Sequence, residues 1–510
     1  MDKLESDAFS VRLGLALRAC LCLRGKRMKH LPVLRCMVAR FALVAPVLLV
    51  LAPTWARAVD ATVTFTVNTT MDQIDDNTSD GICHTSANTC SLRAAIMQAN
   101  RVSTNGSVHI KVPAGRFTLS LAPTFDNGEA SGDLNLTTPV SPSPYLYIDG
   151  DSSATTVIDA NHTDRALSVS AGRIVFLSKL TVLNGNDSDR MGAGGGIQNQ
   201  GLLRLDDCII ENNYSASAGG GIASLLGSML TLQHVTIRSN TTAYSGGGLY
   251  LAGPATLGYA SISANLAQGA GGGVFVSGYG NAHVYSSTIS SNGANFGGGI
   301  EVYFTLVHPQ EIPEVTLVNS TLSGNFAYTD GGGVNNLSKV YSYNSSIIDN
   351  DADHDRDELG GVGGGVNTAS GMRFIAVNSL IARNTILDAP IYNDCNGTLE
   401  VYGRNLFNDV AGCSFTGNGI PARGFVDIDS IGPLQDNGGL TLTHALLAGS
   451  SAINATTTQG CVDDTLVSLS LDERGGLRGE GLNCDVGAYE YGATPPVTDR
   501  IFRNGFEVVP

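Results

Sequence analysis

A glycine triplet that recurs at short, nearly regular spacing constrains the fold of this 510-residue chain more than any other feature. Successive triplets begin 25, 27, 25, 26, 34 and 32 residues apart. Such a period is typical of repeat architectures, in which each unit packs only against its neighbours. The triplets are Gly194–Gly196, Gly219–Gly221, Gly246–Gly248, Gly271–Gly273, Gly297–Gly299, Gly331–Gly333 and Gly363–Gly365.

Each unit also places an aliphatic residue three positions before an asparagine. The pairs are Ile210/Asn213, Ile237/Asn240, Ile262/Asn265, Ile289/Asn292, Leu322/Asn325, Ile347/Asn350 and Ile381/Asn384. Three consecutive glycines would destabilise a helix by about 1 kcal/mol each relative to alanine. Stacked strands with glycine corners and asparagine ladders accommodate them. The repeat therefore predicts an all-β, right-handed parallel β-helix, with the handedness taken from the crossover rule for parallel strands.

Two inserts account for the two long spacings. They cover Val302–Glu314 and Asp351–Gly361. If the helix does more than present a surface, these interruptions are where we expect that function.

Residues 1–58 are basic and end in an apparent export signal. Two arginines precede the apolar run Phe41–Ala52, and the A-R-A sequence at 56–58 predicts cleavage after Ala58. The apolar run is short for a membrane span. The long stretch before it indicates that translation starts at Met28 or Met37. An uncleaved anchor is the second interpretation.

The formal net charge of −16 understates how acidic the remaining chain is, because basic residues outnumber acidic ones within 1–58. An acidic surface repels nucleic acid and anionic lipid and attracts cations. We therefore expect no nucleic-acid partner, no transmembrane span in the mature chain, and an extracellular or outer-surface location.

Seven cysteines follow residue 58, and six of them form three sequence-local couples that flank the repeats. In an oxidising compartment we expect disulfides Cys83–Cys90, Cys395–Cys413 and Cys461–Cys484, although six thiols allow 15 connectivities and spacing alone does not choose. Cys208 lies on the same strand face as Ile210, which predicts a small buried hydrophobe.

Residues 90–96 read CSLRAAI. Ser91 is a favourable helix N-cap, and Leu92, Ala95, Ile96 and Ala99 share one helical face. This stretch resembles the CSLREA domain, an N-terminal module of bacterial surface proteins. Alanine at position 94 replaces the family glutamate and removes a capping-box partner. We expect the helix to cover the open edge of the first coil.

The repeats resemble two known groups. One is the pectin-lyase-like right-handed β-helix superfamily. The other is the polymorphic outer-membrane-protein repeat, whose GGAI-like and FxxN-like elements correspond to GGGI and IxxN here. The second resemblance implies surface display and adhesion.

The C-terminal region contains IGPL, DNGG, THAL, GSSAIN, DERG and CDVGAYE in order between residues 431 and 490. This series resembles the choice-of-anchor Q domain, which closes many bacterial extracellular β-helices. Residues 500–507, RIFRNGFE, resemble the IFxxGFE ending of exported proteins and imply a sorting or attachment tag. A frayed terminus is the alternative.

These patterns divide the chain into five parts. They are a presequence with signal peptide (1–58), a CSLREA-like cap (59–107), the β-helix (108–390), a choice-of-anchor Q-like region (391–491) and a linker with tail (492–510).

The sharpest acidic cluster lies in the second insert, at Asp351, Asp353, Asp355 and Asp357. Alternating carboxylates on one loop suit calcium, which takes six to eight oxygen ligands. Arg356 would serve as the basic residue of a pectate-lyase-like site. A solvated acidic loop is the alternative. The turn with Asp75, Asp76, Asn77 and Asp80 offers a second calcium hypothesis.

A series of aromatic residues surrounds the glycine corners. The predicted ligand-binding residues are Tyr244, Tyr250, Phe275, Phe296, Glu301 and Tyr328, with Tyr214 in the same series. Exposed rings beside a carboxylate are typical of a sugar-stacking surface. The alternative is that these rings cover bare glycine corners.

No GxSxG, HExxH, phosphate-loop or triad-like pattern occurs. We therefore expect an exported protein that binds or adheres without catalysis, to polysaccharide or to a host or neighbouring cell surface, with calcium assistance as a hypothesis. The alternative function is a polysaccharide lyase or glycoside hydrolase on the same scaffold. No catalytic residues are assigned.

Overall fold

The computed structural model describes residues 62–124, 129–139, 143–188, 192–304, 310, 312–355, 360–386, 391–417, 424–456, 460–479 and 483–496. The predicted cleavage point after Ala58, Arg356, Asp357 and the tail motif lie outside these residues.

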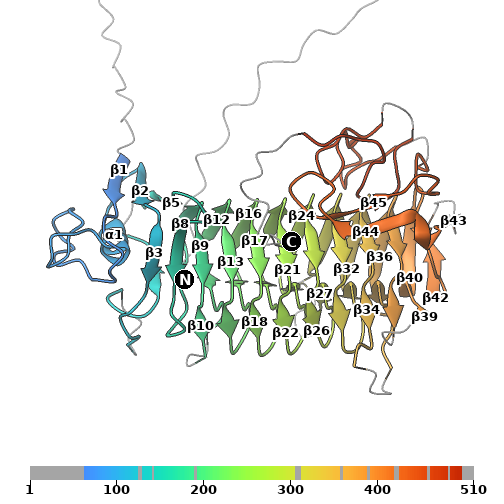
Figure 1. Ribbon diagram of the computed structural model, residues 1–510. Helices are drawn as coiled ribbons and strands as arrows, with labels where there is room; N and C mark the ends of the chain where they lie inside the picture. Colours follow the sequence, from blue (N-terminus) through green and yellow to red (C-terminus); the bar gives the residue numbers. More distant parts are fainter. Residues whose placement is uncertain are drawn as a thin grey trace, which may run out of the picture. The chain divides into compact units, whose positions relative to one another are not determined.

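The chain winds through four short strands per coil, and equivalent strands of successive coils pair in parallel (Figure 1). The coil after the first glycine triplet contains β11 (Ile197–Asn199), β12 (Leu202–Asp206), β13 (Ile209–Glu211) and β14 (Tyr214–Ser215). These strands pair in register with β15, β16, β17 and β18 of the next coil. The architecture is a parallel β-helix, and the prediction from the repeat is confirmed.

We call the four stacks of equivalent strands files a to d. Beyond the strands given above, file a contains β4 (Leu134–Leu136), β7 (Leu167–Val169), β15 (Ile222–Ser224), β19 (Leu249–Leu251), β23 (Val274–Ser277), β27 (Ile300–Tyr303), β31 (Val334–Leu337) and β35 (Val366–Thr368). File b contains β1 (Thr62–Thr66), β2 (Ser107–Val112), β5 (Tyr145–Gly150), β8 (Ile174–Ser178), β16 (Met229–Gln233), β20 (Ala255–Gly258), β24 (Asn281–Tyr285), β28 (Glu314–Val318), β32 (Lys339–Tyr343) and β36 (Arg373–Val377).

File c contains β3 (Gly115–Thr118), β6 (Thr156–Asp159), β9 (Thr181–Leu183), β17 (Thr236–Arg238), β21 (Ser261–Ser263), β25 (Thr288–Ser290), β29 (Thr321–Ser323), β33 (Ser346–Ile348), β37 (Leu380–Ala382), β41 (Leu406–Phe407) and β43 (Gly424–Phe425). File d contains β10 (Asn186–Asp187), β18 (Thr241–Thr242), β22 (Leu266–Ala267), β26 (Gly293–Ala294), β30 (Phe326–Ala327), β34 (Asp351–Ala352) and β38 (Thr385–Ile386), with β39 (Ile391–Tyr392) antiparallel to β38.

Parallel pairing extends beyond the predicted range 108–390 in both directions. β1 pairs with β2 at the N-terminal end. At the other end the longer strand β40 (Cys395–Tyr402) pairs with both β35 and β36, and β42 (Gly412–Thr416) stacks on it.

The interior is a set of aliphatic columns. Ile210, Ile237, Ile262 and Ile289 occupy equivalent positions in successive coils of file c, and all four are fully buried. Because strands in one sheet are about 4.8 Å apart, each column is a continuous apolar contact along the helix. Cys208 joins this core and is 1% exposed, as predicted.

The glycine triplets form the corner between files d and a. The first glycine has a positive φ, +67° at Gly219. A Cβ at the second, Gly220, would lie 2.3 Å from the carbonyl oxygen of Thr241 in the next coil. Backbone passes so close to backbone here that no side chain fits, which explains why three glycines recur.

The asparagines three residues after the core isoleucines form a ladder. The Nδ2 group of Asn265 donates to Oδ1 of Asn292 (2.9 Å) and to the Ile237 carbonyl (3.0 Å). The same pattern runs from Asn213 to Asn384. It ends at Asp394, whose two carboxylate oxygens accept four N–H groups. Each asparagine donates its side-chain N–H to the next one, so the last member of the ladder only has to accept, and a carboxylate does so.

The N-terminal end is closed by α1 (Leu92–Ala99). The Ser91 hydroxyl accepts the Ala94 N–H (3.0 Å), and the predicted apolar face joins the same core as the first coils. The Arg93 guanidinium is buried and binds the Asp72 carboxylate at 2.7 Å. The predicted helix and its N-cap are confirmed.

The region after the last coil folds back along the helix, as Figure 1 shows in orange to red. It contains η1 (Ile428–Ser430) and the antiparallel pair β44 (Ile431–Gln435) and β45 (Thr443–Leu446). The Nδ2 groups of three corner asparagines in successive coils donate to its backbone carbonyls: Asn319 to Leu471 (2.7 Å), Asn344 to Val462 (2.5 Å) and Asn378 to Gly460 (3.0 Å).

Three disulfides join Cys83–Cys90, Cys395–Cys413 and Cys461–Cys484, which confirms the predicted pairs. Within the described part of the chain, no helix has the length and apolar character needed to cross a membrane.

Candidate functional site

The predicted calcium loop is only partly described. The two carboxylate oxygens of Asp351 bind His354 Nδ1 (2.9 Å) and Thr385 Oγ1 (2.8 Å). Asp353 is buried, whereas Asp355 is exposed. Among the described residues, no group of three or more His, Cys, Asp or Glu side chains is arranged to hold a metal ion. Asp357 lies outside the described residues, so calcium binding at this loop stays a prediction.

The second acidic turn is occupied by protein donors. Asp75 accepts the backbone N–H of Asn77 (3.0 Å) and the Gln98 side-chain amide (2.9 Å). The His84 ring lies between Asp76 and Asp80. Desolvation lowers the pKa of His84, but these two carboxylates outweigh it and hold that pKa above its usual value.

Tyr244 and Phe296 lie on the corner between file d and the glycine triplets, in coils two apart. Their side chains are 66% and 42% exposed. Neither ring has an aromatic partner among the residues that the structure describes. The coil between them places Gly269 and Ala270 at the equivalent positions. The intervening coil thus carries no large side chain at these two positions, and the two coils with rings are two strand spacings, about 10 Å, apart along the helix.

Tyr328, from the same corner, has a different environment. Its ring lies 5.8 Å from Phe326 at an interplanar angle of 78°, and His354 packs against both rings. This cluster connects the aromatic corner to the start of the acidic insert through the His354–Asp351 bond.

Tyr250, Phe275 and Glu301 form one outward column on file a, as their positions in the repeat predict. Tyr250 and Phe275 stack with centroids 5.5 Å apart, and Phe275 stacks on Tyr303 at 6.0 Å. However, Phe275 and Glu301 are only 8% and 2% exposed. The glycine corner passes directly against this column: a Cβ at Gly271 would lie 2.7 Å from Phe275 Cβ, and one at Gly297 would lie 2.8 Å from Glu301 Oε2. Phe275 and Glu301 therefore lack the open surface that we expected from the sequence.

Glu301 begins a second amide ladder, which runs opposite to the first. Asn396 donates to Asn367 (2.8 Å), Asn367 donates to Asn335 (2.9 Å), and Asn335 binds the Glu301 carboxyl. The other oxygen, Oε2, has no hydrogen-bond partner among the residues that the structure describes. Burial raises the pKa of Glu301 to about 8.

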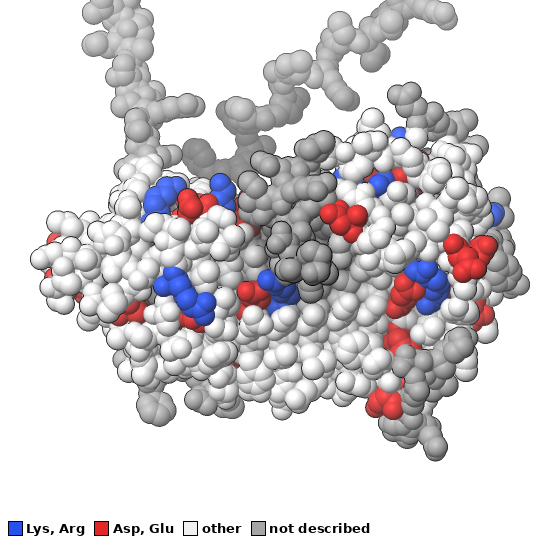
Figure 2. All heavy atoms as spheres, viewed as in Figure 1, with Lys and Arg blue, Asp and Glu red and all other residues white. Residues whose placement is uncertain are grey.

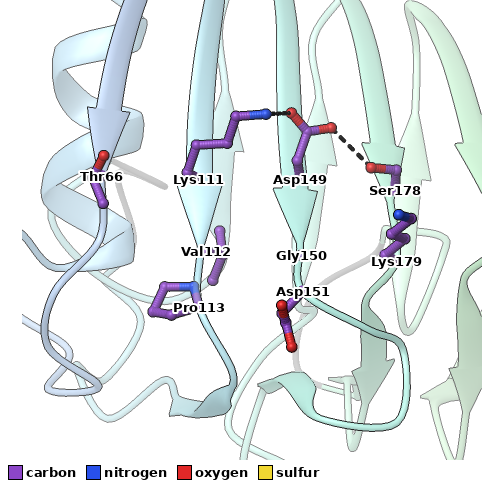
Figure 3. Close-up of a pocket in the computed structure, with 9 residues that line it drawn as sticks. All are labelled: Thr66, Lys111, Val112, Pro113, Asp149, Gly150, Asp151, Ser178 and Lys179. Carbon is purple, nitrogen blue, oxygen red and sulfur yellow. Dashed lines mark hydrogen bonds and ion pairs between the residues drawn. The ribbon is translucent and has the colours of Figure 1, made fainter.

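An open pocket of about 440 Å³ lies near the N-terminal end, at the corner that follows β2, β5 and β8 (Figure 3). Lys111 Nζ binds Asp149 Oδ2 at 2.7 Å, and Ser178 Oγ donates to Asp149 Oδ1 at 2.8 Å. Burial raises the pKa of Asp149, but these bonds outweigh it and hold the value below normal. Lys179 and Asp151 complete the charged lining.

Beside this pocket the rings of His109, Tyr147 and Phe176 stack at centroid distances of 4.5 Å. The alternation in VHIKV (108–112), YLYIDG (145–150) and IVFLS (174–178) places these three residues outward, so a strict period-two reading would have found them. Stacked rings cover each other's faces and present mainly edges to a ligand.

On the face viewed in Figure 2, acidic and basic side chains lie beside one another in small groups on a largely uncharged surface. Some acidic side chains are thus paired locally with basic ones, as Glu211 is with Arg238 (2.7 Å).

No protein-family model matches the chain, and no curated protein matches it. Among solved structures, the crystal structure of pectate lyase Pel9A is similar, with a TM-score of 0.48 and 13% sequence identity. The match covers 84% of this chain and 96% of that chain. At this identity the likeness concerns the fold alone.

Proposed function

We propose that this protein is an exported, non-catalytic binder of extended polysaccharide, held at the outer surface of the cell. The observation that carries the proposal is the pair of exposed rings at Tyr244 and Phe296. In the coil between them, the equivalent positions hold the small residues Gly269 and Ala270. An exposed ring offers an apolar face to the C–H face of a sugar, and two rings at a fixed separation select a polymer.

The rigid scaffold supports this function, because side chains on stacked strands hold their spacing without ordering a loop on binding. The three disulfides support export, since such bonds persist in oxidising compartments. The basic start of the chain, with its apolar run and A-R-A sequence, supports it in the same way.

The test is affinity electrophoresis of the purified chain in gels that contain xylan, mannan, β-glucan or polygalacturonate. We expect retardation by at least one polymer, and a dissociation constant about tenfold higher for the double variant Tyr244→Ala/Phe296→Ala, at roughly 0.7 kcal/mol per ring. Tyr279→Ala, which removes a ring that is 47% exposed on a different corner, is the matched control. New reducing or unsaturated sugar ends after incubation would contradict a purely binding role.

The attachment proposal has a separate test. Cell fractionation of the full chain and of a chain lacking residues 494–510 should place only the full chain on the outer surface. Equal surface retention of both would show that the tail is not an attachment signal.

A further inference from the structure

We propose that the outer face of file b carries a stacking subsite for one pyranose unit, built on Tyr285 where the helix meets the C-terminal region. This inference rests on the proposed polysaccharide-binding function and adds a site away from the Tyr244–Phe296 corner.

The Tyr285 ring lies flat on the sheet. Gln233, Gly258 and Tyr285 occupy equivalent outward positions on β16, β20 and β24. A Cβ added at Gly258 would lie 2.2 Å from Cζ, 2.3 Å from Oη and 2.6 Å from Cε2 of Tyr285. These three atoms share the ring plane, and a point nearly equidistant from all of them lies off that plane. Gly258 therefore sits beneath the face of the ring, not beside its edge.

The subsite that we infer uses the part of the ring that stays exposed. Tyr285 is half-buried: one face of its ring rests on the β20 backbone, and the residue also packs against an apolar cluster that includes Val318 and Val462. In the stacks of His109, Tyr147 and Phe176, by contrast, neighbouring rings cover each other's faces. Among these outward rings of file b, Tyr285 is the one laid over a glycine.

The ring is held in place by its neighbours. Its hydroxyl reaches across β20 and donates to Gln233 Oε1 at 2.9 Å. The Tyr259 ring stands almost perpendicular to it, at 81° with centroids 5.9 Å apart. The Tyr285 ring forms the flat base, or platform, of the proposed subsite, and the perpendicular Tyr259 ring forms one side of it. Because both rings are already held in place, binding a ligand does not require either of them to lose freedom.

Two planar charged groups lie on one side of the Tyr285 ring. The Arg204 guanidinium and the Asp206 carboxylate pair at 2.7 and 2.8 Å on the Gln233 side. Both charges lie close enough to act on the Tyr285 hydroxyl, with Arg204 favouring its ionised form and Asp206 opposing it. Groups of this kind bind adjacent sugar hydroxyls in pairs, while the ring takes the apolar face.

The C-terminal region forms the far border. His283, two residues before Tyr285 on β24, has its ring 6.1 Å from the Tyr285 ring. Its Nε2 lies 3.4 Å from Asp464 Oδ1 in that region. A sugar on the platform would therefore contact the helix and the C-terminal region together, which gives that region a role in binding.

Two substitutions remove the platform in different ways. Tyr285→Ala deletes the ring. Gly258→Ala keeps it but places a methyl group 2.2 Å from it, so the ring must lift; the backbone of Gly258 is not in the left-handed region and accepts alanine. Tyr279→Ala, at an exposed ring on a different corner, is the matched control. Thermal unfolding and near-UV circular dichroism check that each variant is folded.

Binding is measured by affinity electrophoresis in the polymers named above and by calorimetry with an oligosaccharide of the retained polymer. We expect dissociation constants about three- to tenfold higher for Tyr285→Ala and Gly258→Ala, and within twofold of wild type for Tyr279→Ala. Unchanged binding by both platform variants, with Tyr244→Ala/Phe296→Ala still weakened, would overturn this subsite and leave the proposed function standing. Failure of the wild-type chain to bind any of the polymers would overturn both.

Discussion

At the scale of single residues, two carboxyl groups end the two amide ladders and differ in how well they are satisfied. Asp394 accepts four N–H groups, two on each oxygen. Glu301 binds one amide, and its Oε2 has no partner within the described part of the chain. Burial raises the pKa of both, to about 7 for Asp394 and about 8 for Glu301. A buried carboxyl with an unsatisfied oxygen is less costly when it carries its proton.

The pH dependence of stability should therefore reveal Glu301. Its pKa is near 4.5 when unfolded and about 8 when folded, so the folded chain binds the extra proton between these values. Stability from this group is complete below about pH 4.5 and falls as pH rises to about 8, by roughly 1.4 kcal/mol per unit. Burial also raises the pKa of Asp394, to about 7, and that of Glu473, so both add to the fall in the same direction; the contribution of Glu301 is the part of the slope that its substitution removes.

We expect Glu301→Gln to flatten the fall in unfolding free energy between pH 7 and 8, measured by denaturant titration. Glu400→Gln is the control, because hydrogen bonds from Arg373 and Tyr402 hold the pKa of Glu400 below normal and it does not titrate there. An unchanged slope in Glu301→Gln would contradict the assignment.

Cys208 gives a second prediction at this scale. Burial raises the pKa of its thiol to about 12, and the side chain is 1% exposed. A thiolate is the reactive form, so a chain of residues 59–510 should not react with a thiol reagent near pH 8 when native, whereas the same chain unfolded should react with one equivalent. Rapid reaction of the native chain would show that this coil opens locally.

At the scale of elements, the asparagine ladder joins the corners of successive coils by hydrogen bonds, as strand pairing joins their strands. Each rung donates to two oxygens and accepts from two nitrogens of the preceding rung, as Asn265 does. All rungs are buried, so loss of one leaves several polar groups without partners.

We expect Asn265→Ala to lower the free energy of unfolding by about 2–4 kcal/mol. Gln268→Ala, three residues away and exposed, should change it by less than about 0.5 kcal/mol. Denaturant unfolding measures both. Equal, small effects would mean that water replaces the lost rung.

At the scale of the whole molecule, the buried side chain of Glu473 links the C-terminal region to the helix by hydrogen bonds. The Glu473 carboxylate accepts hydroxyls from Thr288 (3.1 Å) and Thr321 on file c and from Thr441 (3.0 Å) in its own region. Burial raises the pKa of Glu473 well above its usual value.

Glu473→Ala should loosen this region, because three buried hydroxyls lose their acceptor. We expect a loss of about 2–4 kcal/mol and faster proteolytic cleavage within 460–496 than in wild type. Glu473→Gln keeps an acceptor for Thr288 and Thr441 and should remain close to wild type. Cleavage of both variants at the wild-type rate would show that packing alone holds the region.

Much of the fold was readable from local sequence because each repeat makes the same contacts with the next. The spacing of Gly219–Gly221 and Asn213 predicted the corner and the ladder, and period-two alternation predicted which side chains face inward. The three disulfide pairs were also predicted, since their partners are close in sequence. The CSLREA and choice-of-anchor Q resemblances stay predictions.

The candidate site was less predictable. Tyr244 and Phe296 were expected to be exposed and are. Phe275 and Glu301 were expected to be exposed on the same ligand-binding surface, but both are buried against the glycine corner. The period of the repeat does not show how closely a corner packs against the neighbouring strand. Tyr285 was missed, because its role depends on a glycine 27 residues earlier.

By itself, the sequence determined the helical stack of strands, its inward columns and its ladders, because these follow from a repeat that pairs with itself. Only the tertiary structure decided which outward residues are open. That depends on where residues 460–496 return along the coils, through contacts such as Asn319 with Leu471 and Asp464 with His283, more than 150 residues apart. Such contacts join segments with no common period, so no local pattern encodes them.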